Sequence, residues 1–223
     1  MALAWMRASW LAWSIAATFP CAMGARGQAV VEGKVTLPAK PAEAVSTPRY
    51  RAKNAGAIAL PEAPKAVVYL EGVFPANSST NAAPPVLVEQ KGFQFAPGLI
   101  PVLKGTRVEF PNQDGDYHNV FSYSKTKRFD LGRYRQDEKP AAIVFDQPGV
   151  VKLYCEIHEH MRGTILVLDT PFFTKSDGEG IFRLEHLPAG NYVLKAWLDE
   201  KTIWVKPVEL HAGVTLHVDF SGK

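Results

Sequence analysis

Residues 149–169 read GVVKLYCEIHEHMRGTILVLD, and this stretch decides the fold class of the 223-residue chain. Residues 149–155 and 163–169 are rich in β-branched and aliphatic residues, as strands are, and a short polar loop separates them. Similar runs, broken by Gly, Pro, Asn and Asp, occupy residues 29–38, 65–72, 86–92, 99–105, 106–112, 118–124, 141–146, 180–187, 191–198, 202–210 and 214–220. With no convincing amphipathic helix between them, they predict an all-β sandwich or barrel.

Three segments interrupt the strands. Residues 39–64 and 73–85 are rich in Ala and Pro or in small polar residues, and we expect long loops there. Residues 124–140 (SKTKRFDLGRYRQDEKP) are strongly charged. We expect a solvated surface loop in this segment, with partner docking as the alternative function.

The N-terminus has the layout of a secretory signal peptide. Residues 1–27 carry Arg7, an apolar run over residues 8–17 and then small residues, with Ala25 and Gly27 placed for cleavage before Gln28. We therefore expect a protein that is periplasmic or otherwise exported. The alternative is an uncleaved anchor, because three tryptophans in this segment could sit at a bilayer interface.

Cleavage would change the composition in an informative way. Arg7 and Arg26 are the only charged residues of the segment, so the formal net charge would fall from +3 to +1, which does not imply a nucleic-acid-binding surface. Cys21 would leave with it, so Cys155 would be the only cysteine and no internal disulfide framework is expected. Met161, six residues after Cys155, would be the only methionine.

Residues 154–163 concentrate the metal-binding side chains. Cys155, His158 and Met161 offer a thiolate, an imidazole and a thioether within seven residues, and this mixture suits copper that cycles between Cu(I) and Cu(II). His118 opens the run 118–124, and antiparallel pairing could bring it beside the end of the run 149–155. Each of these residues taken alone has an ordinary structural explanation, but their combination predicts a metal site. His160 is expected on the surface.

Residues 154–163, the Cys-x2-His-x2-Met spacing and the upstream His118-Asn119-Val120 resemble the small blue copper proteins, the cupredoxins of the amicyanin and plastocyanin type. The resemblance covers about residues 86–170 and implies a Greek-key β-sandwich with one type 1 copper. His118, Cys155 and His158 would be equatorial ligands and Met161 the weak axial ligand. Asn119 would tie the two ligand loops together. A redox partner of cytochrome or dehydrogenase type would dock near His158, the expected electron port.

The loop also departs from that family. Glu156, Ile157, Glu159 and His160 surround His158 where prolines are typical. The acidic rim favours a basic partner. The departure from the family pattern also leaves two alternatives open: an additional ligand, either His160 or a glutamate, and a red-copper type of site.

Residues 174–192 contain Asp177-Gly178, Gly180-Ile181-Phe182 and Leu187-Pro188-Ala189-Gly190, and they resemble the second half of a carboxypeptidase regulatory-like, transthyretin-type sandwich. The first half would begin at Gly33-Lys34-Val35 and continue at Ala66–Leu70. This implies a second small β-sandwich, made of residues 28–75 and 171–223, into which the copper domain of residues 86–170 is inserted. We expect His186, His211 and His217 in this part to be structural or exposed to solvent.

Together these patterns predict an exported protein with one copper ion that carries single electrons. One alternative is a copper storage or delivery protein, and another is an interaction protein whose second sandwich matters most. We do not expect an enzyme, because a copper ion with four protein ligands lacks the open position that substrate chemistry needs.

Overall fold

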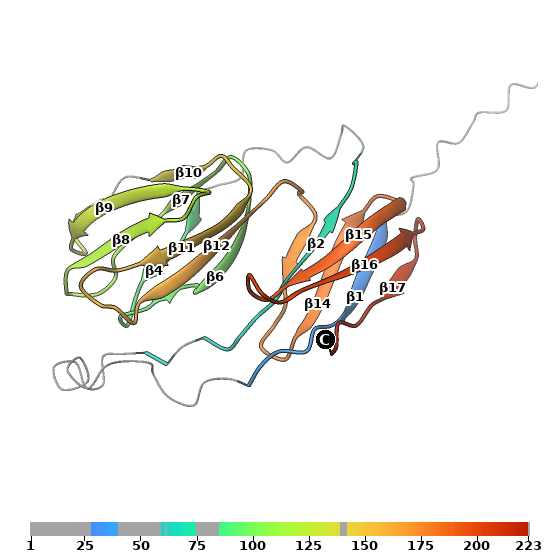
Figure 1. The fold of residues 1–223 in the computed structure, drawn as a ribbon, viewed down its shortest axis with the longest axis horizontal. Helices are drawn as coiled ribbons and strands as arrows, with labels where there is room; N and C mark the ends of the chain where they lie inside the picture. The colour runs from blue at the N-terminus through green and yellow to red at the C-terminus, as the bar shows by residue number, and fades with distance from the viewer. Residues whose placement is uncertain (1–27, 40–58, 61, 75–84, 139–141, 223) are drawn as a thin grey trace, which may run out of the picture.

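The structure is a computed structural model that describes residues 28–39, 59–60, 62–74, 85–138 and 142–222. The described residues form strands and no helix, which confirms the all-β fold. In this part of the chain, accordingly, there is no helix of the length and apolarity needed to cross a membrane. The predicted signal peptide, residues 1–27, lies outside the described residues. Figure 1 shows the strands in two groups, one green to yellow and one mainly orange, red and blue.

The first group contains a five-stranded sheet, a three-stranded sheet and a short two-stranded pair. The five-stranded sheet has the order β6 (Leu99–Leu103), β12 (Arg162–Leu168), β11 (Gly149–Tyr154), β8 (His118–Tyr123) and β9 (Arg128–Tyr134). The three-stranded sheet has the order β10 (Ile143–Phe145), β7 (Thr106–Glu109) and β3 (Val86–Leu87). The two-stranded pair consists of β4 (Glu89–Gln90) and β5 (Phe95–Ala96).

One hydrophobic core joins the sheets of the first group. Val108 and Phe145 come from the three-stranded sheet, and Val151 and Ile165 come from the five-stranded sheet. All four side chains are at most 1% exposed. Cys155 and Met161 belong to the same buried cluster, so the predicted metal loop lies at the edge of this core.

The second group combines strands from both ends of the described chain. One sheet has the order β14 (Ile181–Leu187), β1 (Ala29–Lys34) and β17 (Thr215–His217). The other has the order β13 (Phe173–Lys175), β2 (Val67–Glu71), β15 (Gly190–Trp197) and β16 (Ile203–Leu210). A separate core lies between these sheets and includes Val31, Leu70, Leu184 and Leu194.

A third, smaller cluster connects the two groups of strands. Its buried members are Val67, Tyr69, Leu166, Leu168 and Trp197. β12 therefore has both faces covered: Ile165 and Val167 point into the first core, and Leu166 and Leu168 contact the second group. This explains why residues 163–169 are apolar without alternation.

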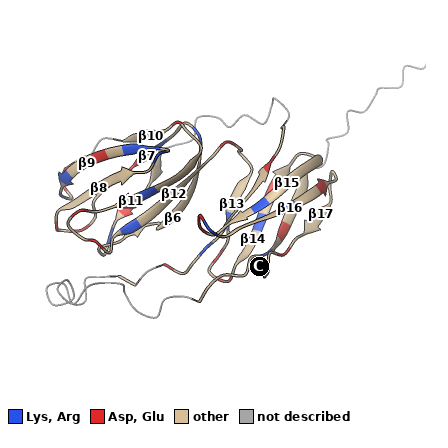
Figure 2. Ribbon diagram, viewed as in Figure 1, with Lys and Arg blue, Asp and Glu red and all other residues tan. Residues whose placement is uncertain are grey.

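The prediction of a loop over residues 124–140 is wrong for its central part. Residues 128–134 form β9, which pairs with β8 at the edge of the five-stranded sheet. Charged side chains on an exposed edge strand discourage pairing with other chains, so charge and strand structure are compatible here. Figure 2 shows both basic and acidic segments on β9.

Candidate metal centre

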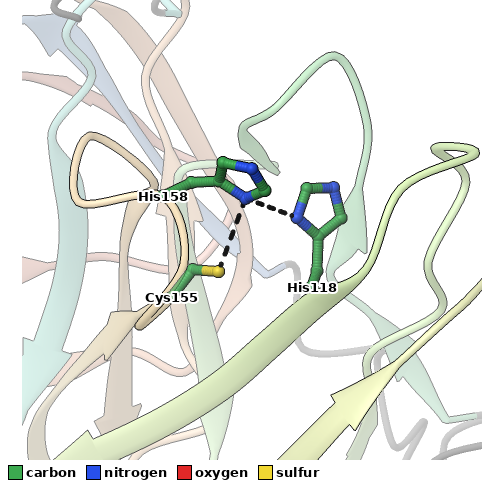
Figure 3. Close-up of side chains that lie close together, drawn as sticks. All are labelled: His118, Cys155 and His158. Carbon is green, nitrogen blue, oxygen red and sulfur yellow. Dashed lines mark hydrogen bonds between the residues drawn. The ribbon is translucent and has the colours of Figure 1, made fainter. Parts of the chain in front are cut away.

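His118, Cys155 and His158 meet at one end of the five-stranded sheet (Figure 3). Their candidate ligand atoms all lie within 4.8 Å of one another. The two histidine Nδ1 atoms are 3.0 Å apart, and the Cys155 sulfur lies 3.8 Å from His158 Nδ1. The three residues are 0%, 4% and 3% exposed, so water is largely kept from the donors.

Strand pairing brings these residues together. β11 pairs antiparallel with β8 through Tyr154 and Phe121, which confirms the predicted approach of the start of one strand to the end of the other. His118 is the first residue of β8, and Cys155 directly follows β11. The loop between β11 and β12 is closed by a hydrogen bond in which the Met161 N–H donates to the His158 carbonyl over 2.9 Å.

Met161 has no exposed area and packs in the core cluster that contains Cys155. A buried thioether in the same cluster as the thiol is available to a soft metal ion such as Cu(I). Its role as a weak axial ligand stays a prediction.

Asn119 links the two ligand segments. Its backbone N–H donates to the Cys155 sulfur over 3.5 Å, and its side-chain oxygen accepts the Glu156 N–H over 3.4 Å. Its side-chain amide donates to Asp130 over 2.7 Å and to the Gly132 carbonyl over 3.1 Å. Asn119 thus holds β8, β9 and the loop after Cys155 in one arrangement.

Asp114 is a functional residue whose role the sequence alone did not indicate. One of its carboxylate oxygens, Oδ2, lies 2.9 Å from Nε2 of His118. When Nε2 donates this hydrogen bond, Nδ1 of His118 keeps its lone pair. Nδ1 faces the other candidate metal-ligand atoms. The signal in the sequence was an acidic residue four positions before His118 within the turn-rich loop that precedes β8.

Phe93 is the second residue that the sequence analysis missed. Its ring stands edge-on against both histidine rings, with centroid distances of 5.4 Å to His118 and 4.9 Å to His158. Its backbone has a φ of 58°, a left-handed conformation that costs a residue with a Cβ about 1–2 kcal/mol. Asp114 accepts the backbone N–H of Phe93 over 3.0 Å and that of Gly92 over 2.8 Å, and these bonds offset part of that cost.

The electrostatic environment of His158 suits a neutral imidazole. Burial, together with the neighbouring His118 ring, lowers the pKa of His158 to about 4. His158 is therefore neutral at pH 7 and can offer a lone pair without first losing a proton. The buried donors comprise one soft sulfur and two imidazole nitrogens, and this set fits a copper ion.

Neither a protein-family model nor the sequence of a curated protein matches this chain. Among solved structures, the chain is similar to a Cu-containing nitrite reductase (NirK) from Thermus scotoductus SA-01, with 25% identity over 44% of this chain and a TM-score of 0.38. The match spans only 25% of the nitrite reductase.

Two further solved structures are also similar to this chain. A reduced tryptophan-to-tyrosine mutant of amicyanin is 18% identical over 45% of this chain and 98% of its own, with a TM-score of 0.36. The novel purple cupredoxin from Nitrosopumilus maritimus is 27% identical over 33% of this chain and 81% of its own, with a TM-score of 0.30.

The expectation that His160 is a surface residue is wrong. Its side chain is half-buried, both of its ring nitrogens are buried, and its ring centroid lies 6.1 Å from that of His158. Burial lowers the pKa of His160. Within the described part of the chain, neither His160 nor a glutamate belongs to the group of ligand atoms formed by His118, Cys155 and His158.

The acidic rim expected around His158 is partly balanced. Glu156 and Glu159 are exposed, but Glu156 Oε1 lies 2.6 Å from Nε of Arg133 on β9. The strand that was expected to be a loop therefore supplies a cation next to the metal loop. The rim is less acidic than residues 156–160 indicate by themselves.

Proposed function

We propose that this protein binds one copper ion through His118, Cys155 and His158, with Met161 as a weak axial ligand, and that it carries single electrons outside the cytoplasm. The proposal rests on one observation: three buried donors, one at the start of β8 and two in the loop after β11, have their ligand atoms within 4.8 Å of one another. Bound copper would supply a Cu(I)/Cu(II) couple, and we assign the site to the type 1 kind of the cupredoxins.

The surrounding residues suit electron transfer because they fix the ligands. Asp114 and Asn119 hydrogen-bond the two ligand segments, and Phe93 packs against both histidine rings. Fixed ligands keep similar positions in both oxidation states, so little rearrangement accompanies the gain or loss of an electron. Such a buried site offers no open position for a substrate, and we propose a carrier and not an enzyme.

The domain organisation belongs to the same proposal. Residues 86–170 would form the copper domain, inserted into a second, regulatory-like sandwich made of residues 28–75 and 171–223. Support comes from the pairing of β1 with β14 and β17, and of β2 with β13 and β15. Export rests on residues 1–27, which read as a signal peptide. The partner would be a redox protein of cytochrome or dehydrogenase type that docks near His158.

The test is an absorption and electron spin resonance spectrum of the copper-loaded protein. We expect a strong thiolate-to-copper band that bleaches reversibly on reduction, and its loss in Cys155→Ser. His160→Ala is the matched control within the same loop and should keep the band. Copper that binds without this band would contradict the electron-carrier proposal and favour storage, delivery or a red-copper type of site.

A further inference from the structure

We propose that Asp114 is a positioning residue that holds the metal site closed, because its one carboxylate fixes both a ligand and the aromatic ring that covers the ligands. This inference rests on the proposed copper site and adds to it a residue that controls access. Three groups bond the carboxylate: His118 Nε2 at 2.9 Å, Phe93 N–H at 3.0 Å and Gly92 N–H at 2.8 Å.

The first action of Asp114 is on the ligand. His118 has no exposed area, and its two ring nitrogens face different partners: Nε2 faces Asp114, and Nδ1 faces His158. A carboxylate behind a histidine fixes the ring orientation and the tautomer, and this makes the other nitrogen a better ligand. Asp114 is itself held in place, because its N–H donates to the Asn112 side-chain oxygen over 2.8 Å.

The second action of Asp114 is on the cover. Phe93 and Gly92 both have left-handed backbones, with φ values of 58° and 62°, and both of their N–H groups donate to Asp114. Further bonds tie this segment to the loop before β8: the Gln90 N–H donates to the Pro111 carbonyl and the Gln113 N–H to the Gln90 carbonyl. Phe93 itself is 7% exposed, and its ring packs edge-on against both imidazoles.

The two actions are coupled because they use the same carboxylate. Loss of the carboxylate would free the Phe93 backbone to leave its left-handed conformation and would free the His118 ring to turn. Both changes would admit water and competing ligands to the metal. Asp114 would thus slow metal exchange without touching the metal.

The experiment uses the full-length, copper-loaded protein with three variants, Asp114→Ala, Asp114→Asn and Phe93→Ala. The control is Asp116→Ala, which removes an exposed carboxylate from the same loop. Transfer of Cu(II) to EDTA is timed, and water access is followed by the relaxation of solvent protons. We expect release to be about 10–100-fold faster in Asp114→Ala and intermediate in Asp114→Asn. In Phe93→Ala the release should be faster with little change of the copper spectrum.

A spectroscopic difference separates positioning from general destabilisation. Asp114→Ala should alter the copper hyperfine splitting, because a ligand ring is released, whereas Phe93→Ala should alter mainly water access. Copper release at the wild-type rate in a folded Asp114→Ala variant would overturn the inference and leave the copper proposal intact. If Asp114→Ala does not fold, wild-type release rates in Asp114→Asn would overturn it equally.

Nuclear magnetic resonance of the copper-free protein gives a readout that does not depend on the copper proposal. The Nε2 proton of His118 and the amide protons of Gly92 and Phe93 should exchange slowly with solvent in the wild type and clearly faster in Asp114→Asn. Unchanged exchange at all three positions would contradict the role of Asp114. Absence of a thiolate band in wild-type protein would instead contradict only the proposed electron carrier.

Discussion

The backbone N–H of Asn119 donates to the sulfur of Cys155 over 3.5 Å, so the residue after the first ligand holds the second. The Asn119 side chain supports this contact through hydrogen bonds to Asp130, the Gly132 carbonyl and the Glu156 N–H. The two ligand segments are therefore joined by hydrogen bonds of the protein itself. A site joined in this way depends on residues that do not contact the metal.

The first prediction concerns the Asn119 side chain, which is 1% exposed. Asn119→Ala removes the hydrogen bonds of a buried side chain to Asp130, the Gly132 carbonyl and the Glu156 N–H, and should lower the free energy of unfolding by about 1–3 kcal/mol. Urea unfolding of the copper-free protein measures this. Asn191→Ala, at an exposed asparagine on β15, is the control and should change it by less than about 0.5 kcal/mol. Equal effects in the two variants would contradict the linking role.

The second prediction tests the axial role of Met161. Met161→Leu keeps the volume of a fully buried side chain, so the free energy of unfolding should fall by less than about 1.5 kcal/mol. If the thioether is a ligand, its loss should disfavour Cu(II) more than Cu(I) and raise the reduction potential. Redox titration and the absorption spectrum measure the change. An unaltered potential and spectrum would leave Met161 as a core residue only.

The third prediction concerns the ion pair between Arg133 and Glu156, whose side chains are 63% and 45% exposed. Arg133→Ala should reduce the free energy of unfolding by no more than about 1 kcal/mol, because exposed pairs are screened by water. It leaves the rim of the metal loop more acidic, so electron exchange with a cationic inorganic complex should be faster at low salt. Stopped-flow kinetics at several salt concentrations measures the effect. The control, Arg107→Ala, breaks another exposed pair, with Glu109, and an equal acceleration there would show that only net charge matters.

The fourth prediction concerns the second group of strands. At Gly33 on β1, an added Cβ would lie 2.0 Å from the Val218 carbonyl oxygen, a backbone atom that cannot move alone. Gly33→Ala should therefore lower the free energy of unfolding by about 1–3 kcal/mol. At Gly115 an added Cβ would meet nothing within 4 Å, so Gly115→Ala is the matched control. Thermal unfolding of both variants decides whether the close approach of the two backbones constrains this position.

Much of the fold could be predicted because the strands carry local signals. The β-branched runs and their breaks placed most of the strands, and the pairing of β8 with β11 followed from the positions of His118 and Cys155. β9 was missed because its charges look like those of a solvated loop, while its strand structure comes from pairing with β8. The solvation of an edge strand differs little from that of a loop, so local composition does not separate them.

The candidate site was predictable only where its residues are close in sequence or chemically distinctive. Cys155, His158 and Met161 share one loop, so their grouping needs no knowledge of the fold. The contacts of Asp114 and Phe93 join segments that are separate in sequence. An aspartate in a turn and a phenylalanine after a glycine have common local explanations, so only the structure shows that they meet at the histidines.

The covering of β12 on both faces has a practical consequence for dissecting the molecule. The strand that follows the metal loop presents Leu166 and Leu168 to residues of the second group such as Trp197. A separate fragment of residues 86–170 would expose these two leucines to water. Such a fragment would tend to aggregate or to adsorb to surfaces. Biochemical work should therefore use the full-length protein. Polar substitutions at Leu166 and Leu168 are needed only when the fragment of residues 86–170 is studied alone.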